Sequence, residues 1–165
     1  MHTQFGEGSA GSGAEAAYTT TVLGSRDGPV EVAWATALAA PSNGFPRIVV
    51  NLRPGMPVQP MTLMVPKLAV EQTRLLLGAA QAGMADAVVA CVADGVIDPF
   101  DAPRTLLLAA VWLDPAAADE DLVFANQRAA ARAALRSGAA GGRPVSDVVS
   151  ASSAGAWNLF FRDRT

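Results

Sequence analysis

The alternation of strand-like and helix-like segments is the feature that most restricts the fold of this 165-residue chain. Short runs of β-branched, aromatic and aliphatic residues alternate with longer runs whose apolar residues recur at helical spacing. With neither a Gly-rich phosphate loop nor a repeat, this order predicts an α/β or α+β fold with one sheet covered by helices. Strands are expected at residues 16–23, 47–52, 61–65, 104–112 and 145–150, and helices at residues 29–38, 71–94 and 119–136.

The two ends of the chain differ in composition from its middle. A chain of this length fits one domain. Residues 1–14 are rich in Gly, Ser and Ala, which predicts a flexible segment unless a ligand or a neighbouring subunit orders it. The domain is therefore expected over residues 15–150. Residues 151–165 form a tail whose aromatic cluster at 157–161 is expected to pack, for instance at an interface.

Composition favours self-association and argues against several partners. Charged residues make up 16% of the chain and hydrophobic residues 51%, so some apolar surface is expected between subunits. The net charge of −3 comes without a basic stripe, which argues against nucleic acid. The longest strongly apolar run is too short for a membrane span. Cys91 is the single cysteine, which excludes an intrachain disulfide and fits a reducing compartment. We therefore expect a cytoplasmic protein without membrane contact.

Lys67 is the only lysine, although the chain contains eleven arginines. Since Arg is used wherever a generic positive charge suffices, a single lysine at a predicted strand end invites a chemical explanation. A lysine amine loses its proton more readily when it is buried and can then add to an aldehyde, which a guanidinium cannot do. Lys67 is therefore the best candidate for contact with a carbonyl compound. The alternative is a solvated lysine without a role.

Other polar residues give weaker signals. His2, the only histidine, lies in the Gly-rich terminus, which argues against a His-based triad or metal site. Acidic residues near predicted turns lack calcium-loop spacing, and helix capping explains them better, so no metal is expected. Asn51 and Gln81 are each a structural amide or a ligand contact, with the structural role favoured. The acidic residues are Asp98, Asp101, Asp114, Asp119, Glu120 and Asp121.

Several segments, taken in order, carry a family resemblance: Gly6-Glu7, residues 24–29, residues 60–64 followed by Lys67, and residues 78–83. Together they resemble the family of the formaldehyde-activating enzyme. The resemblance extends over roughly residues 6–150. It implies a fold like domain 2 of ribosomal protein S5 and a homopentamer with ligand sites between subunits. It also implies condensation of formaldehyde with tetrahydromethanopterin, which yields the methylene derivative and water.

The resemblance assigns roles to individual positions. In the family, a histidine acts as general acid, while a lysine and a glutamine line the pterin site. Lys67 and Gln81 match that lysine and that glutamine, and Val49 stands where a leucine contacts the ligand through its backbone. The resemblance therefore implies that these three residues bind the substrate, with Lys67 also a candidate catalytic residue.

Three other positions depart from the family pattern. Tyr18 stands at the histidine position, Thr20 at that of a pterin-contacting aspartate, and Ala69 at that of a ligand-contacting threonine. A tyrosine with a pKa near 10 is a poorer acid–base catalyst than a histidine near 6.5, although Tyr18 remains a candidate catalytic residue. Loss of the aspartate removes a hydrogen bond to a charged group, typically worth about 1.5–3 kcal/mol, so pterin binding is expected to be weak.

Three hypotheses follow. The leading one is a divergent family member that binds formaldehyde or a related aldehyde at Lys67, with a tetrahydropterin or another amine as acceptor. The second retains the family activity, with Tyr18 or a water molecule as the proton donor. The third is a non-catalytic pentameric binding or sensing protein of one-carbon metabolism.

Overall fold

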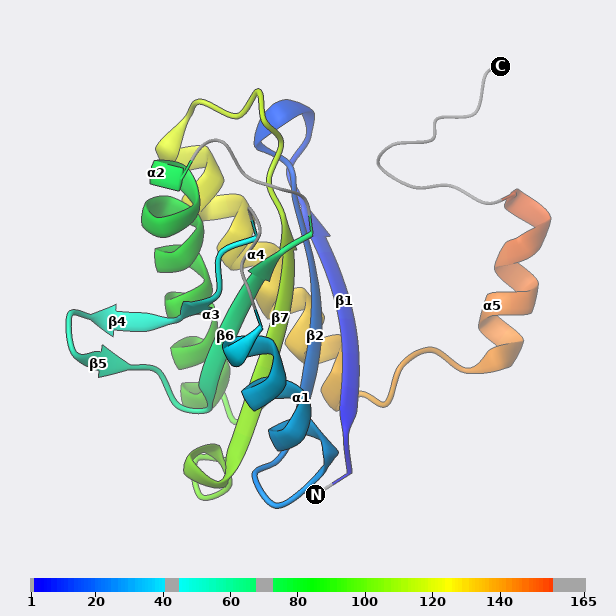
Figure 1. Ribbon diagram of the computed structural model, residues 1–165. Coiled ribbons are helices and arrows are strands. Elements are labelled where there is room, and N and C mark those ends of the chain that lie inside the picture. Colours follow the sequence, from blue (N-terminus) through cyan, green and yellow to red (C-terminus); the bar gives the residue numbers. More distant parts are fainter. Residues whose placement is uncertain (1, 41–44, 68–72, 156–165) are drawn as a thin grey trace.

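A five-stranded sheet forms the centre of the molecule (Figure 1). The computed structural model describes residues 2–40, 45–67 and 73–155. The strand order is β1-β2-β7-β6-β3, with β6 and β7 parallel and the other neighbours antiparallel. The strands are β1 (Gln4–Ala10), β2 (Ala17–Ser25), β3 (Ile48–Val49), β6 (Met61–Pro66) and β7 (Thr105–Trp112). This mixed sheet with packed helices confirms the expected α/β (α+β) class.

Helices cover the two faces of the sheet unequally. We call the face toward α3 and α4 the covered face and the face toward α1 the open face (Figure 1). A short turn, α2, and the π-helical segment η2 lead directly into α3. These elements are α1 (Pro29–Ala39), α2 (Thr73–Leu75), η2 (Leu76–Ala80), α3 (Gln81–Ala93) and α4 (Glu120–Ala139). The predicted helices are therefore confirmed over the described residues.

Short elements complete the architecture. The 3-10 turn η1 joins β1 to β2, η3 precedes β7, and α5 and η4 follow α4. The hairpin of β4 and β5 follows β3 and precedes β6 in the sequence, and it projects away from the sheet (Figure 1). Their bounds are η1 (Gly13–Glu15), β4 (Asn51–Arg53), β5 (Met56–Pro57), η3 (Ala102–Arg104), α5 (Val145–Ala151) and η4 (Ser152–Ala154).

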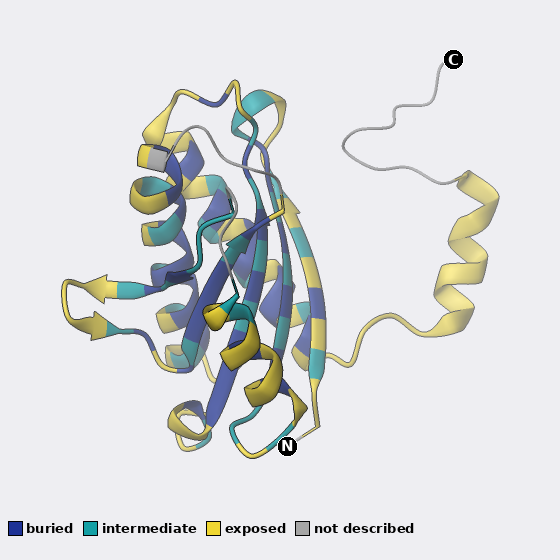
Figure 2. Cartoon of the chain, in the orientation of Figure 1, coloured by how far each residue is buried: buried dark blue, intermediate teal, exposed yellow. Residues whose placement is uncertain are grey.

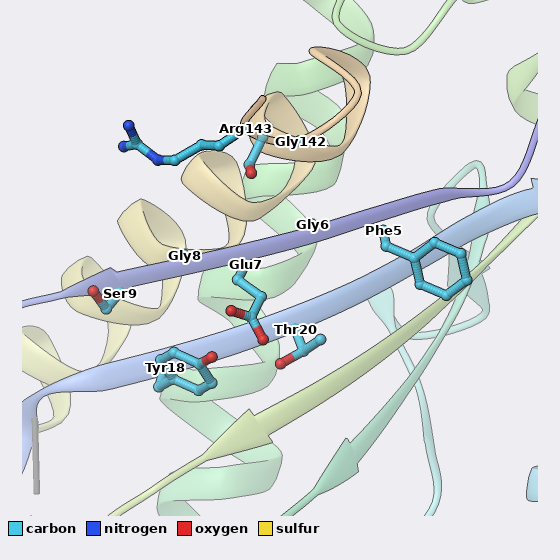
Figure 3. A pocket seen from close by; sticks show the side chains of 10 residues that line it. Phe5, Gly6, Glu7, Gly8, Ser9, Tyr18, Thr20, Gly142 and Arg143 are labelled. Atoms are coloured by element: carbon cyan, nitrogen blue, oxygen red, sulfur yellow. The ribbon is translucent and has the colours of Figure 1, made fainter. Parts of the chain in front are cut away.

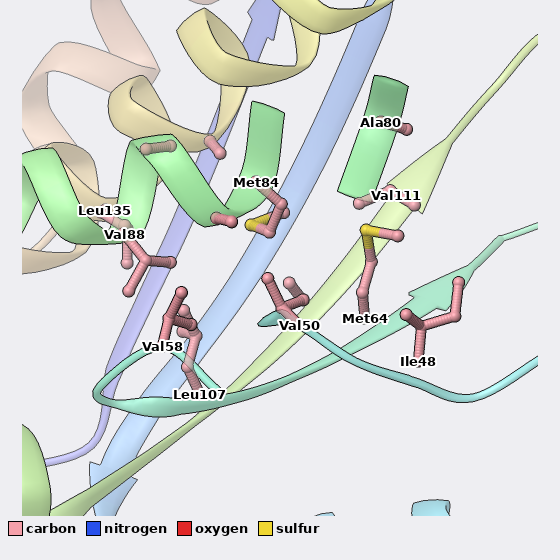
Figure 4. Packing of buried hydrophobic residues seen from close by; sticks show 14 of the residues in the cluster. Ile48, Val50, Val58, Met64, Ala80, Met84, Val88, Leu107, Val111 and Leu135 are labelled. Atoms are coloured by element: carbon pink, nitrogen blue, oxygen red, sulfur yellow. The ribbon is translucent and has the colours of Figure 1, made fainter. Parts of the chain in front are cut away.

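The main core lies between the covered face and helices α3 and α4. Met84, Val88 and Cys91 from α3 are fully buried and belong to one cluster with Leu107 and Val111 from β7 (Figure 4). The segment Leu76–Ala93 has the length and hydropathy of a membrane span, but its buried residues make it the core helix of this domain. Cys91, the single cysteine, is thus buried in this core.

The start of α4 shows why its boundary was predictable. Asp119 lies at the N-cap, and its side chain accepts hydrogen bonds from the backbone N–H groups of Asp121 and Leu122. These bonds satisfy donors that have no partner within the helix. The capping role expected for Asp119 is therefore confirmed.

The N-terminal segment differs from its prediction. Residues 1–14 were expected to be flexible, but Gln4–Ala10 form β1 and pair with β2 over their whole length. Gly6 and Gly8 face α4 so closely that a Cβ at either would collide with a backbone oxygen of Ala134 or Ala130. The glycines therefore permit close packing of strand against helix and do not signal disorder.

The C-terminal part differs as well. Residues 145–150 were predicted to be a strand, but Val145–Ala151 form the helix α5, which projects away from the sheet (Figure 1). A β-branched composition favours a strand where the side chains pack on a half-buried sheet, and these residues are all exposed. The aromatic cluster at 157–161 lies outside the described residues.

Candidate functional site

Lys67 follows β6 directly and reaches the open face of the sheet. Its backbone N–H donates to the carbonyl of Val111 at 2.7 Å, which continues the pairing of β6 with β7. Because side chains alternate along a strand, Lys67 points to the same face as Leu63 and Val65. Its Nζ donates to Thr20 Oγ1 at 2.8 Å and lies 3.9 Å from the centroid of the Tyr18 ring.

Two strands supply the partners of this amine. Tyr18 and Thr20 are two residues apart on β2, so both point to the open face, and both are half-buried. Glu7 on β1 is the register partner of Thr20, which places its side chain on the same face (Figure 3). We call Glu7, Tyr18, Thr20 and Lys67 the lysine cluster.

The lysine cluster lies where α1 leaves the sheet uncovered. Leu63 and Leu106, beneath α1, are buried with Val30 and Trp34 of that helix. Farther along the strands, the open face is less buried (Figure 2). Tyr18 and Thr20 are half-buried there, and Glu7 and Lys67 are exposed. One end of this face is therefore accessible to a ligand.

A pocket opens beside the cluster at the edge of the sheet (Figure 3). Its volume is about 600 Å³, and Glu7, Tyr18 and Thr20 contribute to its lining. Arg143, which follows α4, lines the same pocket. The pocket is therefore large enough for a small molecule and carries charges of both signs.

Electrostatics act on the two titratable side chains in opposite directions. Partial burial of the otherwise exposed Lys67 side chain lowers the pKa of its amine, and the negative charge of Glu7 partly offsets this effect. Burial raises the pKa of Tyr18, and Glu7 raises it further as hydrogen-bond partner and as a charge, while a hydrogen bond with Thr20 lowers it. Lys67 is thus more often neutral than an ordinary lysine, and Tyr18 keeps its proton.

Val49 and Gln81 form a second group. Gln81 Nε2 donates to the carbonyl of Asn51 at 2.6 Å, and Asn51 Nδ2 donates to the carbonyl of Val49 at 2.8 Å. These bonds tie α3 to the β3–β4 segment, so both amides have the structural role that the sequence favoured. Val49, Asn51 and Gln81 also line a pocket of about 340 Å³, and among the residues that the structure describes it shares none with the lining of the first.

Ala69 and His2 are the remaining candidates. Ala69 lies outside the described residues. His2 is exposed near the start of β1, as expected for a solvated histidine. Among residues 2–40, 45–67 and 73–155, no three His, Cys, Asp or Glu side chains gather as a metal site would require.

Glu7 is the member of the lysine cluster that sequence reasoning missed. Its neighbour Gly6 and Glu7 itself contributed to the family resemblance, but the predicted flexibility of residues 1–14 removed both from the candidate site. The alternation of Gly6 and Gly8 with Glu7 and Ser9 was the available signal, because it is typical of a strand that packs closely on one side.

Fold and cluster together define an α/β protein whose candidate site centres on one lysine amine. The chain matches the family model described as formaldehyde-activating enzyme (Fae) over residues 5–160. It is 34% identical over 148 residues to a 5,6,7,8-tetrahydromethanopterin hydro-lyase of Methanosarcina barkeri, a match that covers 88% of this chain and 83% of the relative. The chain belongs to the formaldehyde-activating enzyme family, which confirms the family identified from sequence.

Longer relatives contain a similar segment. The chain is 35% identical over 144 residues to a bifunctional enzyme Fae/Hps of Methanosarcina barkeri, covering 86% of this chain and 36% of that enzyme. A bifunctional enzyme Fae/Hps of Methanosphaerula palustris is 32% identical over 135 residues, with 80% and 34% covered. The chain therefore spans about a third of the length of these bifunctional relatives.

Proposed function

We propose that this protein binds formaldehyde or a related aldehyde at Lys67 and promotes its condensation with a reduced pterin or another amine. The observation that carries this proposal is the placement of the Lys67 amine. It lies on an accessible sheet face, burial lowers its pKa, and its partners Thr20 and Tyr18 hold it in place. A neutral amine is the form that adds to an aldehyde.

The proposed reaction begins with attack of the neutral Lys67 nitrogen on the carbonyl carbon. The N–C bond forms as the C=O π bond opens, and one amine proton moves to the oxygen to give a carbinolamine. Uptake of one proton and cleavage of the C–O bond then release water and leave an iminium. This intermediate keeps the one-carbon unit at a fixed position for an acceptor.

An acceptor with two N–H groups completes the proposed cycle. One acceptor nitrogen adds to the iminium carbon, and the second displaces Lys67. One acceptor proton restores the lysine amine, and the other replaces the proton taken up when water left. The net change is formaldehyde plus acceptor to methylene-acceptor plus water, which is the condensation that the family resemblance implies.

The residues expected to bind the acceptor depart most from the family pattern. Thr20 stands at the position of a pterin-contacting aspartate, and its hydroxyl accepts a hydrogen bond from Lys67. It therefore offers no carboxylate to a pterin N–H group. We propose tetrahydromethanopterin or another reduced pterin as a weakly bound co-substrate, with Val49 and Gln81 as its further contacts.

We also propose a homopentamer in the cytoplasm, with the site between subunits. Within one chain, Glu7, Tyr18 and Thr20 of the lysine cluster line one pocket, and Val49 and Gln81 line another. The open face is covered by α1 at one end only, and large apolar side chains such as Phe5 and Leu77 are exposed. These features support a neighbouring subunit that completes the site.

A second candidate function is a non-catalytic binding or sensing role in one-carbon metabolism. The observation that favours it is the raised pKa of Tyr18. A phenol that keeps its proton at neutral pH is a poor substitute for the histidine of the family as a general acid. This candidate predicts aldehyde binding without acceleration of the condensation.

The rate of methylene-tetrahydromethanopterin formation from formaldehyde distinguishes the two functions. Acceleration above the uncatalysed rate, lost in Lys67→Ala and in the charge-preserving control Lys67→Arg, is the expected result. Because Arg cannot form the iminium, its failure separates the covalent role from the charge. A wild-type rate equal to the background would exclude this condensation and leave the binding function.

A further inference from the structure

The relative orientation of Tyr18 and Lys67 suggests a role for the tyrosine other than proton donation. Lys67 Nζ lies 3.9 Å from the ring centroid, so the amine meets the face of the ring. The phenol oxygen instead lies beside the side chains of Glu7 and Thr20 (Figure 3), and hydrogen bonding with Glu7 contributes to the raised pKa of Tyr18. The tyrosine hydroxyl therefore faces a carboxylate, while the face of its ring contacts the amine.

Three strands fix this arrangement. Ser9 and Glu7 of β1 pair with Tyr18 and Thr20 of β2, respectively, so the carboxylate and the phenol share one face of neighbouring strands. Lys67 approaches from the end of β6, across β7, and ends on the hydroxyl of Thr20 at 2.8 Å. The amine thus has the ring on one side and an acceptor on another.

We propose that Glu7 and Tyr18 form a positioning pair for the Lys67 amine, in which Glu7 orients the ring and the ring holds the amine for attack on the aldehyde. This inference rests on the proposed function of Lys67. It adds two positioning residues to that function and removes Tyr18 as the proton donor. The family's histidine at this position acts as a general acid, whereas Tyr18 would position the Lys67 amine with the face of its ring.

The pair has two opposite effects on the charge of Lys67. The ring face attracts the ammonium form, and the carboxylate of Glu7 favours that form through its charge. Burial favours the neutral amine. Among the described residues, the titratable groups facing Lys67 are Glu7 from β1 and Tyr18 from β2, while β7 contributes Ala110 and Trp112, which do not titrate. Glu7 therefore raises the pH at which the amine becomes neutral, against the larger and opposite effect of burial.

Direct titration of Lys67 tests this pair without any substrate. Since Lys67 is the only lysine, carbon-13-labelled lysine gives one side-chain signal whose pH dependence reports its pKa. Glu7→Gln is expected to move that titration to lower pH, because the ammonium loses a favourable charge. Glu31→Gln, the matched control at an exposed position of α1, should leave the titration where it is.

Two substitutions of Tyr18 supply the second readout. Tyr18→Phe keeps the ring and loses the hydroxyl, whereas Tyr18→Leu loses both the ring and the hydroxyl. If the ring positions the amine, Tyr18→Phe should form the iminium about tenfold faster than Tyr18→Leu. If both variants formed the iminium at the same reduced rate, the hydroxyl would be the essential group, and the proposed positioning of the amine by the ring would be overturned.

Failure of this inference is distinguishable from failure of the proposed function. An unchanged Lys67 titration in Glu7→Gln would overturn the pair even in a protein that accelerates the condensation. Conversely, a wild-type protein without turnover would contradict the proposed function, while the shifted titration would still establish the influence of Glu7 on the amine. Circular dichroism of each variant confirms that its fold is intact.

Discussion

The two faces of the sheet use polar residues in different ways. On the covered face, Gln127 Nε2 donates to Thr19 Oγ1 at 2.8 Å, and both residues are buried. On the open face, one position farther along β2, Thr20 is half-buried and accepts a hydrogen bond from Lys67. Of these two neighbouring threonines, Thr19 therefore stabilises the core on the covered face, and Thr20 belongs to the candidate site on the open face.

This comparison teaches that burial, more than residue type, separates structural from functional polar groups in this fold. A buried polar pair must satisfy itself within the protein, because an unpaired group there is costly. A half-buried cluster can exchange its internal contacts for contacts with a ligand. Substitutions on the covered face should therefore change stability, and substitutions on the open face should change chemistry.

The largest expected effect is on the covered face. Met84→Ala removes a fully buried side chain from the core between α3 and the sheet. It should lower the free energy of unfolding by about 2–5 kcal/mol, because the cavity cannot fully collapse. Denaturant unfolding measures this loss. The matched control Val32→Ala, at an exposed position of α1, should stay within about 0.5 kcal/mol of wild type.

A smaller loss of stability is expected at Gly8. Gly8→Ala places a methyl group against the backbone of α4 and should lower the free energy of unfolding by about 1–3 kcal/mol. Gly78→Ala is the control, since nothing lies within 4 Å of the added carbon there. If the Gly8→Ala variant unfolded at the same denaturant concentration as wild type, the close packing of β1 on α4 would not contribute to the free energy of unfolding as described.

The fold was largely predictable because its signals are local. The nearly continuous apolar runs of β6 and β7 and the capping Asp119 each specify an element from a few neighbouring residues. The errors at Gln4–Ala10 and Val145–Ala151 came from tertiary context. Glycines in β1 are required by the neighbouring helix, and the valines of α5 have no strand to pair with.

The site was predictable in part for a similar reason. Lys67 stood out by its uniqueness, and the family resemblance pointed to Tyr18 and Thr20. The contact of Lys67 with Thr20 joins residues 47 positions apart, which no local pattern contains. Glu7 was missed because its strand was not predicted. The relation of the Val49–Gln81 group to the lysine cluster stays a prediction about the assembled protein.

On the open face, Thr20→Val should separate chemistry from stability. The substitution removes the acceptor of the Lys67 hydrogen bond, but Lys67 is exposed, so the free energy of unfolding should change by less than about 1 kcal/mol. The rate of reaction with formaldehyde should fall, since the amine is held less well. A large loss of stability in this variant would contradict the distinction between the two faces.

The smallest expected effect is a shift in pH dependence. Because burial lowers the pKa of Lys67, its neutral form should appear at lower pH than for an ordinary lysine of pKa 10.5. The folded state then binds protons less tightly than the unfolded state, so this group destabilises the fold at low pH. Its contribution becomes less unfavourable as the pH rises through the folded pKa. The initial rate of formaldehyde addition against pH measures the shift.

Reductive trapping of formaldehyde tests the central claim most directly. Borohydride converts an iminium into a stable methylamine, and mass spectrometry locates it. The α-amino group at the start of the chain is the internal control, because Lys67 is the only side-chain amine. At neutral pH and low formaldehyde, methylation should occur first at Lys67 in the folded protein. After denaturation, Lys67 should react more slowly than the α-amino group, whose ordinary pKa is lower. Methylation of the α-amino group alone in the folded protein would contradict the account.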